Sequence, residues 1–251
     1  MQRIYLPEVN SGESLTLSKE QSRYLLQVHR MNIGDTLAVF DGKSKEYLAR
    51  ILLANKSSAV IEIVDIIREE LQPETRFILA QALPKQGKME TVIQKACELG
   101  VSEIVPFKSR YSQVRLNEKQ QQKKLERWNK VAEEACRQCR RISVPDIKPL
   151  IDFKDLLKND GEIWLAYEGE NCMPIGDAVS NCKQKCVTMV IGSEGGFSKE
   201  EISLAKEMEA KIVSLGPRVL RTETAGLAIL SILQYTLGDL SGKETPFIYK
   251  G

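Results

Sequence analysis

The sequence has little histidine, little tryptophan and no long apolar run. It contains one histidine and two tryptophans among 251 residues. A helix needs roughly 20 apolar residues to cross a bilayer, and no stretch of the chain approaches that length. The first five residues also lack the apolar core of a secretory signal peptide. These absences predict a cytoplasmic protein without membrane association.

Few residues are available for metal binding or histidine-based catalysis. The single histidine, His29, lies in the first part of the chain, far in sequence from the glycine-rich segments, which argues against a Ser-His-Asp or Cys-His triad. A zinc site needs about four nitrogen or sulfur ligands. The six cysteines are scattered, and no group of four is close in sequence. No metal is expected.

Three nucleotide and hydrolase fingerprints are also absent. The chain has no G-x-G-x-x-G after a strand, no G-x4-G-K-[ST] and no G-x-S-x-G. A dinucleotide-binding site, a P-loop and a nucleophile elbow are therefore not supported.

Positive charge is concentrated in one segment of a nearly neutral chain. The formal net charge is +2, but residues 108–148 contain 12 basic and 5 acidic residues, a local excess of seven positive charges. Such a stretch is typical of proteins that bind polyanions such as RNA. The alternative interpretation is a solvated helix face.

The pattern of the chain changes near residue 70. Before it, short β-prone runs at 3–6, 14–16, 36–40, 47–53 and 59–67 predict a small barrel, interrupted by one helix that begins at a capping box from Ser18 to Gln21. The polar, proline-containing stretch 69–74 is the best linker. We expect one domain over 1–72 and a second over 73–251.

After the linker, strand-like and helix-like segments alternate. Strands are predicted at 76–83, 101–107, 163–167, 187–191 and 211–215, and helices at 88–99, 117–139, 198–210 and 224–240. Alternation of this kind predicts an α/β domain with a mainly parallel sheet covered on both faces.

Two loops that follow predicted strands are the strongest functional signal. Residues 192–197 hold three glycines in five positions, which allows a ligand to approach the backbone closely. Residues 215–225 place Arg218 and Arg221 beside Thr222, Glu223 and Thr224. Loops at the carboxyl ends of parallel strands bind ligands in open α/β sheets. Alternatively, the first is an ordinary turn and a threonine of the second only caps a helix.

Residues 190–198 and 215–225 resemble the paired motifs of the RsmE family, SPOUT-class methyltransferases that modify N3 of a uridine in 16S ribosomal RNA. Segments 28–35, 94–101 and 134–141 resemble further stretches of the same family, so the likeness covers nearly the whole chain. Ser193 stands where the family usually has proline, Cys139 where it has serine and Arg140 where it has glycine.

The resemblance implies a SPOUT-type α/β domain with a deep trefoil knot, an N-terminal PUA-like β-barrel that binds RNA, and a homodimer. It also implies S-adenosylmethionine as the cofactor and the 16S ribosomal RNA of the small subunit as the partner. The cofactor-binding residues expected on this basis are Leu165, Glu168, Ile191, Gly192, Glu194, Gly195, Gly196, Leu215, Gly216, Leu220, Thr222, Thr224 and Ala225.

The chemistry of uridine N3 suggests roles for two further residues. The N3–H group is weakly acidic, so it must lose its proton, and a cation can hold the charge that develops on the base. We expect Arg221 and Glu223 to be catalytic, with Glu194 as another acid in the right loop. N3 lies on the Watson–Crick edge, so the target base must be unpaired or flipped out. The expected RNA contacts are His29, Arg30, Lys108, Arg110, Gln138 and Arg141.

Two other functions remain open at this point. One is a non-catalytic RNA-binding factor in ribosome assembly with an idle pocket. The other is a SPOUT methyltransferase that acts on a different RNA position.

Overall fold

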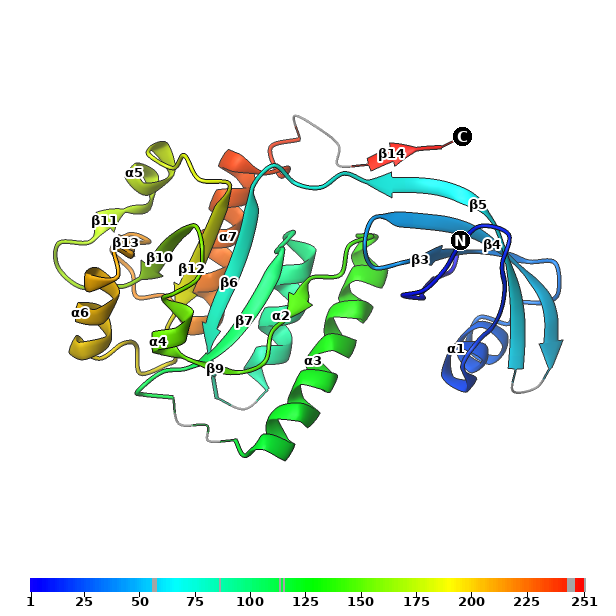
Figure 1. The fold of residues 1–251 in the computed structure, drawn as a ribbon, viewed down its shortest axis with the longest axis horizontal. Helices are drawn as coiled ribbons and strands as arrows, with labels where there is room; N and C mark the ends of the chain where they lie inside the picture. The colour runs from blue at the N-terminus through cyan, green and yellow to red at the C-terminus, as the bar shows by residue number, and fades with distance from the viewer. Residues whose placement is uncertain (56–57, 86, 113, 115, 243–246, 251) are drawn as a thin grey trace. The chain divides into compact units, whose positions relative to one another are not determined.

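The computed structural model describes residues 1–55, 58–85, 87–112, 114, 116–242 and 247–250 (Figure 1). The chain divides into two units. Unit 1 comprises Met1–Gln72, Cys136–Val144 and Thr245–Gly251, and unit 2 comprises Pro73–Ala135 and Pro145–Glu244. The boundary expected from the sequence at residue 72 leaves out the two later segments that cluster with unit 1.

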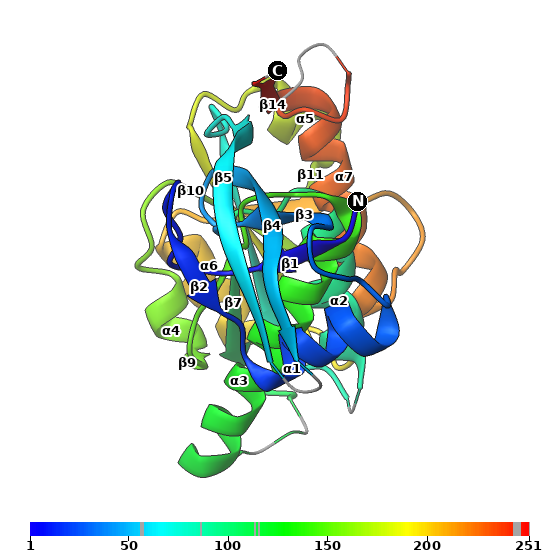
Figure 2. The ribbon, with the colours of Figure 1, turned by 90° about the vertical axis from the view of Figure 1, so that its right-hand side faces the viewer.

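Unit 1 is built on a six-stranded, mainly antiparallel sheet (Figure 2). Its strand order is β1-β3-β4-β5-β14, with β2 paired to β5; β1 and β3 run parallel, and the other described pairs are antiparallel. Three register shifts between β4 and β5 mark bulges, which bend a strand pair. The strands are β1 (Arg3–Tyr5), β2 (Ser14–Thr16), β3 (Thr36–Phe40), β4 (Lys45–Asn55), β5 (Ser58–Glu70) and β14 (Phe247–Tyr249).

The helix predicted in unit 1 is present, but only its first part is a regular α-helix. The capping box of Ser18 and Gln21 is present and starts α1 (Lys19–Arg23). The chain then widens into a π-helical turn, η1 (Tyr24–Val28). This turn shifts the helical periodicity, so Val28, which follows the apolar pattern of the sequence, is 63% exposed.

A buried carboxylate on β4 lies between two buried arginines of unit 1. The Arg3 Nε donates to Glu46, and the Arg68 Nε lies 2.8 Å from the other carboxylate oxygen. Arg3 also donates to the carbonyl oxygens of Cys136, at 2.8 Å, and Arg141, at 2.9 Å. Since buried charges are tolerated only when paired, Glu46 is the centre on which this cluster depends.

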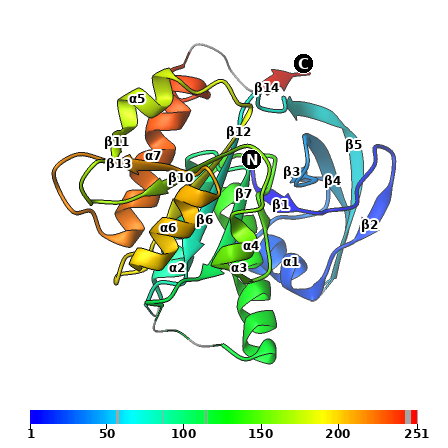
Figure 3. The same ribbon diagram turned by 60° about the vertical axis from the view of Figure 1, so that its left-hand side comes forward.

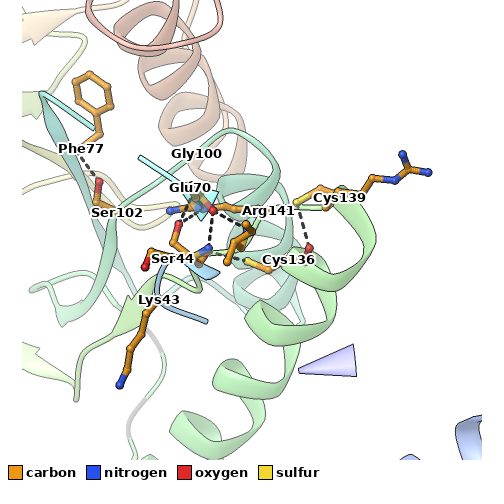
Figure 4. Close-up of polar contacts among 12 residues, drawn as sticks. Lys43, Ser44, Glu70, Phe77, Gly100, Ser102, Cys136, Cys139 and Arg141 are labelled. Carbon is orange, nitrogen blue, oxygen red and sulfur yellow. Dashed lines mark hydrogen bonds and ion pairs between the residues drawn. The ribbon is translucent and has the colours of Figure 1, made fainter. Parts of the chain in front are cut away.

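A second carboxylate of unit 1, Glu70 at the end of β5, holds the segment that follows α3 (Glu118–Cys139). It accepts hydrogen bonds from the backbone N–H groups of Ile142, at 2.6 Å, and Ser143, at 2.7 Å. The side chain of Arg141 lies beside it, with Nε 3.8 Å from Oε1 (Figure 4). These contacts place residues 136–144 in unit 1.

Unit 2 contains a parallel sheet of eight strands. Its order is β11-β13-β10-β12-β6-β7-β8, with β9 also paired to β7. The strands are β6 (Arg76–Ala82), β7 (Glu103–Lys108), β8 (Asp146–Ile147), β9 (Ile151–Asp152), β10 (Glu162–Ala166), β11 (Met173–Pro174), β12 (Cys186–Ile191) and β13 (Lys211–Ser214). The helices besides α3 are α2 (Lys88–Glu98), α4 (Phe153–Leu156), α5 (Ile175–Ser180), α6 (Lys199–Glu207) and α7 (Thr222–Leu237).

Helices cover both faces of this sheet (Figure 3). Ile78 and Ala80 of β6 belong to one core cluster with residues of α4 and α6. The alternate residue Leu79 points to the other face, where a Cβ at Gly226 of α7 would lie only 3.1 Å from its Cδ1. Gly226 therefore lets α7 pack closely on the sheet. This arrangement confirms the predicted parallel α/β sheet. None of the helices described here is both long and apolar enough to cross a membrane.

Candidate functional site

A cavity of about 330 Å³ lies at the carboxyl ends of β10 and β12, where the loop before α7 also passes. Pockets of this size bind small ligands and cofactors. Its wall comes from four parts of unit 2 that are far apart in sequence. The lining residues are Lys88, Ala166, Glu168, Ile191, Gly192, Ser193, Glu194, Gly196, Phe197, Val219, Leu220, Arg221, Thr222 and Ala225.

Most of the residues predicted from the sequence for the cofactor line this wall, and some do not. Leu165 is fully buried in the core cluster of unit 2, and Gly195 lines a neighbouring cavity. Leu215, Gly216 and Thr224 also lie outside the cavity lining, as does Glu223, which was predicted to be catalytic. Ser193, Phe197 and Val219 also line the cavity and lie within the two predicted loops, and Ala166 lies at the strand end beside Leu165, whereas Lys88 lies outside every segment that the sequence indicated.

The first glycine loop closes in a tight turn. The Gly196 N–H donates to the Ser193 carbonyl at 2.9 Å, and Gly196 has a φ of +66°, in the left-handed region that favours glycine. A Cβ at Gly192 would lie 3.1 Å from the Phe197 ring and 3.2 Å from the Gly196 backbone. A side chain at Gly192 would crowd these atoms, and the φ of Gly196 favours glycine, so the turn leaves bare backbone on the cavity wall.

Thr222, at the start of α7, ties the second loop to the first. Its hydroxyl donates to the Gly192 carbonyl and accepts a hydrogen bond of 2.9 Å from the Gln81 Nε2 on β6. Thr222 is 6% exposed. The hydroxyl thus connects β6, the glycine loop and α7, so it fixes the cavity wall through contacts within the protein.

Replacing Thr222 with valine is expected to lower the free energy of unfolding by about 1–3 kcal/mol, because the buried groups of Gly192 and Gln81 lose their partner. Chemical denaturation measures this change. Thr224→Val is the matched control, since Thr224 is exposed on the same turn. Equal stabilities of the two variants would contradict the role of the Thr222 hydroxyl in joining β6, the glycine loop and α7.

Lys88, at the start of α2, bridges the acids of the two loops. Its Nζ lies 3.1 Å from Oε1 of Glu194 and 3.0 Å from Oε2 of Glu223. The Glu194 carboxylate also accepts from the Lys85 backbone N–H, at 3.1 and 3.2 Å. The sequence did carry a signal for this residue: a lysine in the first turn of a helix is disfavoured by the helix dipole, so its place there needs another reason.

Both carboxylates are held in their charged form. The pKa of Glu223 is lowered, mainly by a hydrogen bond from its own backbone N–H at the helix start, with a further contribution from Lys88. Burial raises the pKa of Glu194, but backbone hydrogen bonds and Lys88 outweigh burial and leave it lowered. The hydrogen bond to Glu223, followed by that to Glu194, raises the pKa of Lys88. A carboxylate with a lowered pKa accepts a proton poorly at neutral pH.

Arg221 is the N-cap residue of α7 and lines the cavity, and the residue is exposed. Its backbone carbonyl accepts from the N–H groups of Thr224, at 2.8 Å, and Ala225, at 2.9 Å. The guanidinium lies at a helix N-terminus, where the helix dipole disfavours a cation. Arg218 of the same loop is exposed and lies outside the cavity lining.

The expected RNA contacts lie in both units. In unit 2, Lys108 lies 3.3 Å from Asp152, and the exposed Arg110 lies 3.9 Å from Glu200. In unit 1, the side chain of Arg141 is only 14% exposed and faces Glu70. His29 packs edge-on against Tyr24, with ring centroids 4.4 Å apart, whereas Arg30 and Gln138 are exposed. Arg115 of the basic stretch falls outside the described residues.

Metal binding finds no support in the side-chain geometry. Within the described part of the chain, no group of three or more His, Cys, Asp or Glu residues could hold a metal ion. The charged residues of the first cavity are Lys88, Glu168, Glu194 and Arg221, and the rest of its wall is backbone, hydroxyl and apolar side-chain surface.

Comparison with protein families gives two matches along the chain. Residues 71–234 match the family model described as RNA methyltransferase domain, and residues 17–64 match the model described as RNA methyltransferase PUA domain. Ribosomal RNA small subunit methyltransferase E of Bacillus subtilis is 30% identical over 97% of this chain and 100% of its own length. The protein of the same name from a Buchnera aphidicola strain is 32% identical over 95% of this chain and 98% of its own.

Two solved structures resemble this fold closely. A Legionella pneumophila methyltransferase in complex with S-adenosylmethionine has a TM-score of 0.87 and 35% identity, covering 95% of this chain and 98% of its own. The ribosomal RNA small subunit methyltransferase E of Neisseria gonorrhoeae, bound to S-adenosylmethionine, has a TM-score of 0.87 and 33% identity, covering 95% and 99%.

Proposed function

Because the chain belongs to the RNA methyltransferase family that includes ribosomal RNA small subunit methyltransferase E, we propose that it transfers a methyl group from S-adenosylmethionine to N3 of a uridine in 16S ribosomal RNA. The observation that carries this proposal is the cavity that two glycine-containing loops form at the strand ends of unit 2. Two similar structures hold S-adenosylmethionine. The resemblance of the loop motifs to the RsmE family supports N3 of uridine as the methyl acceptor.

The residues of the cavity fit this cofactor. Gly192 and Gly196 expose backbone on one wall, and Glu168, Glu194 and Ile191 supply polar and apolar surface around it. When bound, S-adenosylmethionine supplies an electrophilic methyl group on a positively charged sulfur. The protein then has to hold the acceptor in line with that methyl group and to manage charge.

We assign different roles to the charged residues in and beside the cavity. Arg221 is the exposed cation of the wall, and we assign it to the negative charge that develops on the uracil oxygens as N3 loses its proton. Glu223, which the sequence suggested as a catalytic acid, instead holds Lys88. Its lowered pKa favours a positioning role over that of a proton acceptor.

Replacing Lys88 with methionine is expected to weaken the binding of S-adenosylmethionine roughly three- to tenfold near neutral pH, since two partly exposed ion pairs are lost and two carboxylates then repel each other. Isothermal calorimetry measures the affinity. Lys88→Arg keeps the charge and should retain most of it. Lys95→Met, on the exposed side of the same helix, is the matched control.

The Lys88 effect should depend on pH in a defined direction. The pKa values of Glu194 and Glu223 are lowered, so their ion pairs contribute fully above the ordinary glutamate pKa of about 4.3 and are lost as the pH falls through the lowered values. The affinity ratio between wild type and Lys88→Met should shrink toward one in that acid range. A ratio independent of pH would show that Lys88 acts through packing alone.

Unit 1 and the basic surface of unit 2 are proposed to hold the RNA. The PUA-type match in unit 1 and the excess positive charge of residues 108–148 support this role. The contacts proposed in unit 1 are His29, Arg30 and Gln138, and those proposed in unit 2 are Lys108 and Arg110. Because Arg141 faces Glu70, we assign its side chain mainly to stabilising unit 1 and only secondarily to binding RNA.

We also propose a homodimer, a knotted C-terminal domain and a cytoplasmic location, where ribosomal RNA is modified. Exposed apolar side chains on and around α7 support a subunit interface: Val219 is 75% exposed, Tyr235 67% and Leu240 48%. Light scattering of the purified protein measures the number of subunits. A monomer at micromolar concentration would contradict the interface.

The test of the reaction is mass-spectrometric mapping of methyl groups on small ribosomal subunits and on free 16S ribosomal RNA, each treated with protein and S-adenosylmethionine. We expect N3-methyluridine as the product. A methyl group on another atom or base would favour a SPOUT enzyme with a different target. Failure to bind S-adenosylmethionine in calorimetry would favour a non-catalytic RNA-binding factor.

A further inference from the structure

A second cavity, of about 560 Å³, opens beside the first at the same edge of the sheet. It lies where β6, β7 and β12 end, and it is lined by Lys85, Arg110, Tyr111, Ser112, Glu194 and Gly195. Glu194 lines both cavities. A molecule in the second cavity would therefore lie next to one in the first.

The loop after β7 that presents Tyr111 is held by hydrogen bonds to the neighbouring elements. The backbone N–H of Arg110 donates to Oε1 of Glu201, at 2.9 Å, and Glu201 is itself fixed by the Ser198 N–H at 2.8 Å. The Ser109 hydroxyl donates to the Ser193 hydroxyl at 3.4 Å. Ser193 is the residue that replaces the proline usual in the family, so this chain has a contact there that proline cannot make.

Tyr111 packs against the glycine loop and still exposes much of its surface. A Cβ at Gly195 would lie 2.7 Å from the Tyr111 Cβ, so the two backbones are in close contact. Tyr111 is nevertheless 48% exposed. A large aromatic side chain on a well-held loop and open to solvent is a surface on which a base can stack.

Two cations flank this aromatic surface. Lys85 and Arg110 are both exposed. The Arg110 guanidinium lies 3.9 Å from Glu200, and both of these side chains are largely exposed. So weak a surface pair is easily exchanged for a phosphate. Aromatic side chains combined with cations are the chemistry that proteins use to bind single-stranded nucleic acid.

We propose that the second cavity binds a nucleotide of the single-stranded RNA substrate, with its base stacked on Tyr111 and its phosphate held by Arg110 and Lys85. This inference rests on the proposed function. A nucleotide in the second cavity would place the RNA strand next to the methyl donor in the first cavity, since Glu194 lines both.

The test compares Tyr111→Ala with Tyr111→Phe in an equilibrium titration of a fluorescein-labelled, single-stranded RNA oligonucleotide containing the target uridine. Loss of the ring should weaken RNA binding about tenfold, whereas the phenylalanine variant should stay close to wild type. Calorimetry with S-adenosylmethionine should give the same affinity for all three proteins. Equal RNA affinity of wild type and Tyr111→Ala would overturn the proposal. A parallel loss of cofactor affinity would also overturn it, since Tyr111 would then only support the glycine loop.

The cations are tested by the salt dependence of the same titration. Arg110→Ala and Lys85→Ala should each lower the slope of log affinity against log salt by about one. Lys158→Ala, which removes an exposed charge of the same unit outside both cavities, should leave the slope unchanged. Slopes that do not differ from wild type would show that Arg110 and Lys85 do not contact phosphate, and that part of the proposal would fail.

These titrations separate this inference from the reaction itself. They require no methyl transfer, so a wild-type protein that binds the RNA and leaves it unmethylated would refute the proposed reaction and not the nucleotide site. A wild-type protein that methylates RNA while the Tyr111 and Arg110 variants bind it as well as wild type would refute the site and not the reaction.

Discussion

Replacing Arg221 with alanine is expected to lower kcat for RNA methylation about a hundredfold to a thousandfold, the usual loss when one donor to developing negative charge is removed. The affinity for S-adenosylmethionine should change far less, because the cofactor methyl centre is itself positively charged. The measurements are single-turnover methylation with saturating RNA and cofactor, and calorimetry with cofactor alone.

The structure gives a physical reason to single out this arginine. Arg221 is the N-cap of α7 and faces the cavity, although a cation at a helix N-terminus opposes the helix dipole. Its position is therefore not explained by the stability of the helix. Arg221→Ala should leave the free energy of unfolding unchanged or slightly raised while activity falls.

The control for Arg221 lies three residues earlier. Arg218 is exposed on the same loop and does not line the cavity, so Arg218→Ala should retain most of kcat. Arg221→Lys keeps the charge without the planar fork of donors and should be intermediate. If both arginine-to-alanine variants lost kcat equally, the loop charge as a whole would be responsible, and the assignment of Arg221 to the base would fail.

The parts of the site that could be predicted from the sequence are those whose residues are neighbours along the chain. The spacing of glycines in 192–197 indicated the tight turn that Gly196 makes with a φ of +66°. The apolar runs before both loops indicated strands β12 and β13, and the parallel order followed from the alternation of strands and helices. Local patterns of this kind depend on backbone geometry that a few residues determine.

The contacts that were missed join segments far apart in sequence. Lys88 pairs with acids more than a hundred residues away, and no periodicity of α2 indicates which loop its lysine will meet. Residues 136–139 were predicted as the end of a basic helix of the second domain, yet residues 136–144 pack in unit 1 because Arg3 and Glu70 bind their backbone. Predicting such contacts requires knowing which distant segments meet in the folded chain, and no local sequence pattern specifies that.

The buried carboxylate Glu46 is the clearest case of such a long-range contact, and its removal should have the largest effect on stability. Glu46→Ala is expected to lower the free energy of unfolding by about 3–5 kcal/mol, since it leaves Arg3 and Arg68 as buried charges without their anion. Burial lowers the pKa of Arg3, and the hydrogen bond with Glu46 opposes that shift. Urea unfolding followed by circular dichroism measures the loss.

The matched control lies on the next strand of the same sheet. Glu69 of β5 forms a pair of 2.8 Å with Lys250, in which the side chains are 27% and 47% exposed, so Glu69→Ala should cost about 0–1 kcal/mol. Glu46→Gln, which keeps the shape and an acceptor oxygen, should fall between the two. Because Arg3 also binds the carbonyls of Cys136 and Arg141, loss of Glu46 should loosen residues 136–144 first, and hydrogen exchange there should rise before that of β3. Equal costs for Glu46→Ala and Glu69→Ala would mean that water or a rearranged side chain compensates the arginines, and the cluster would then not organise unit 1.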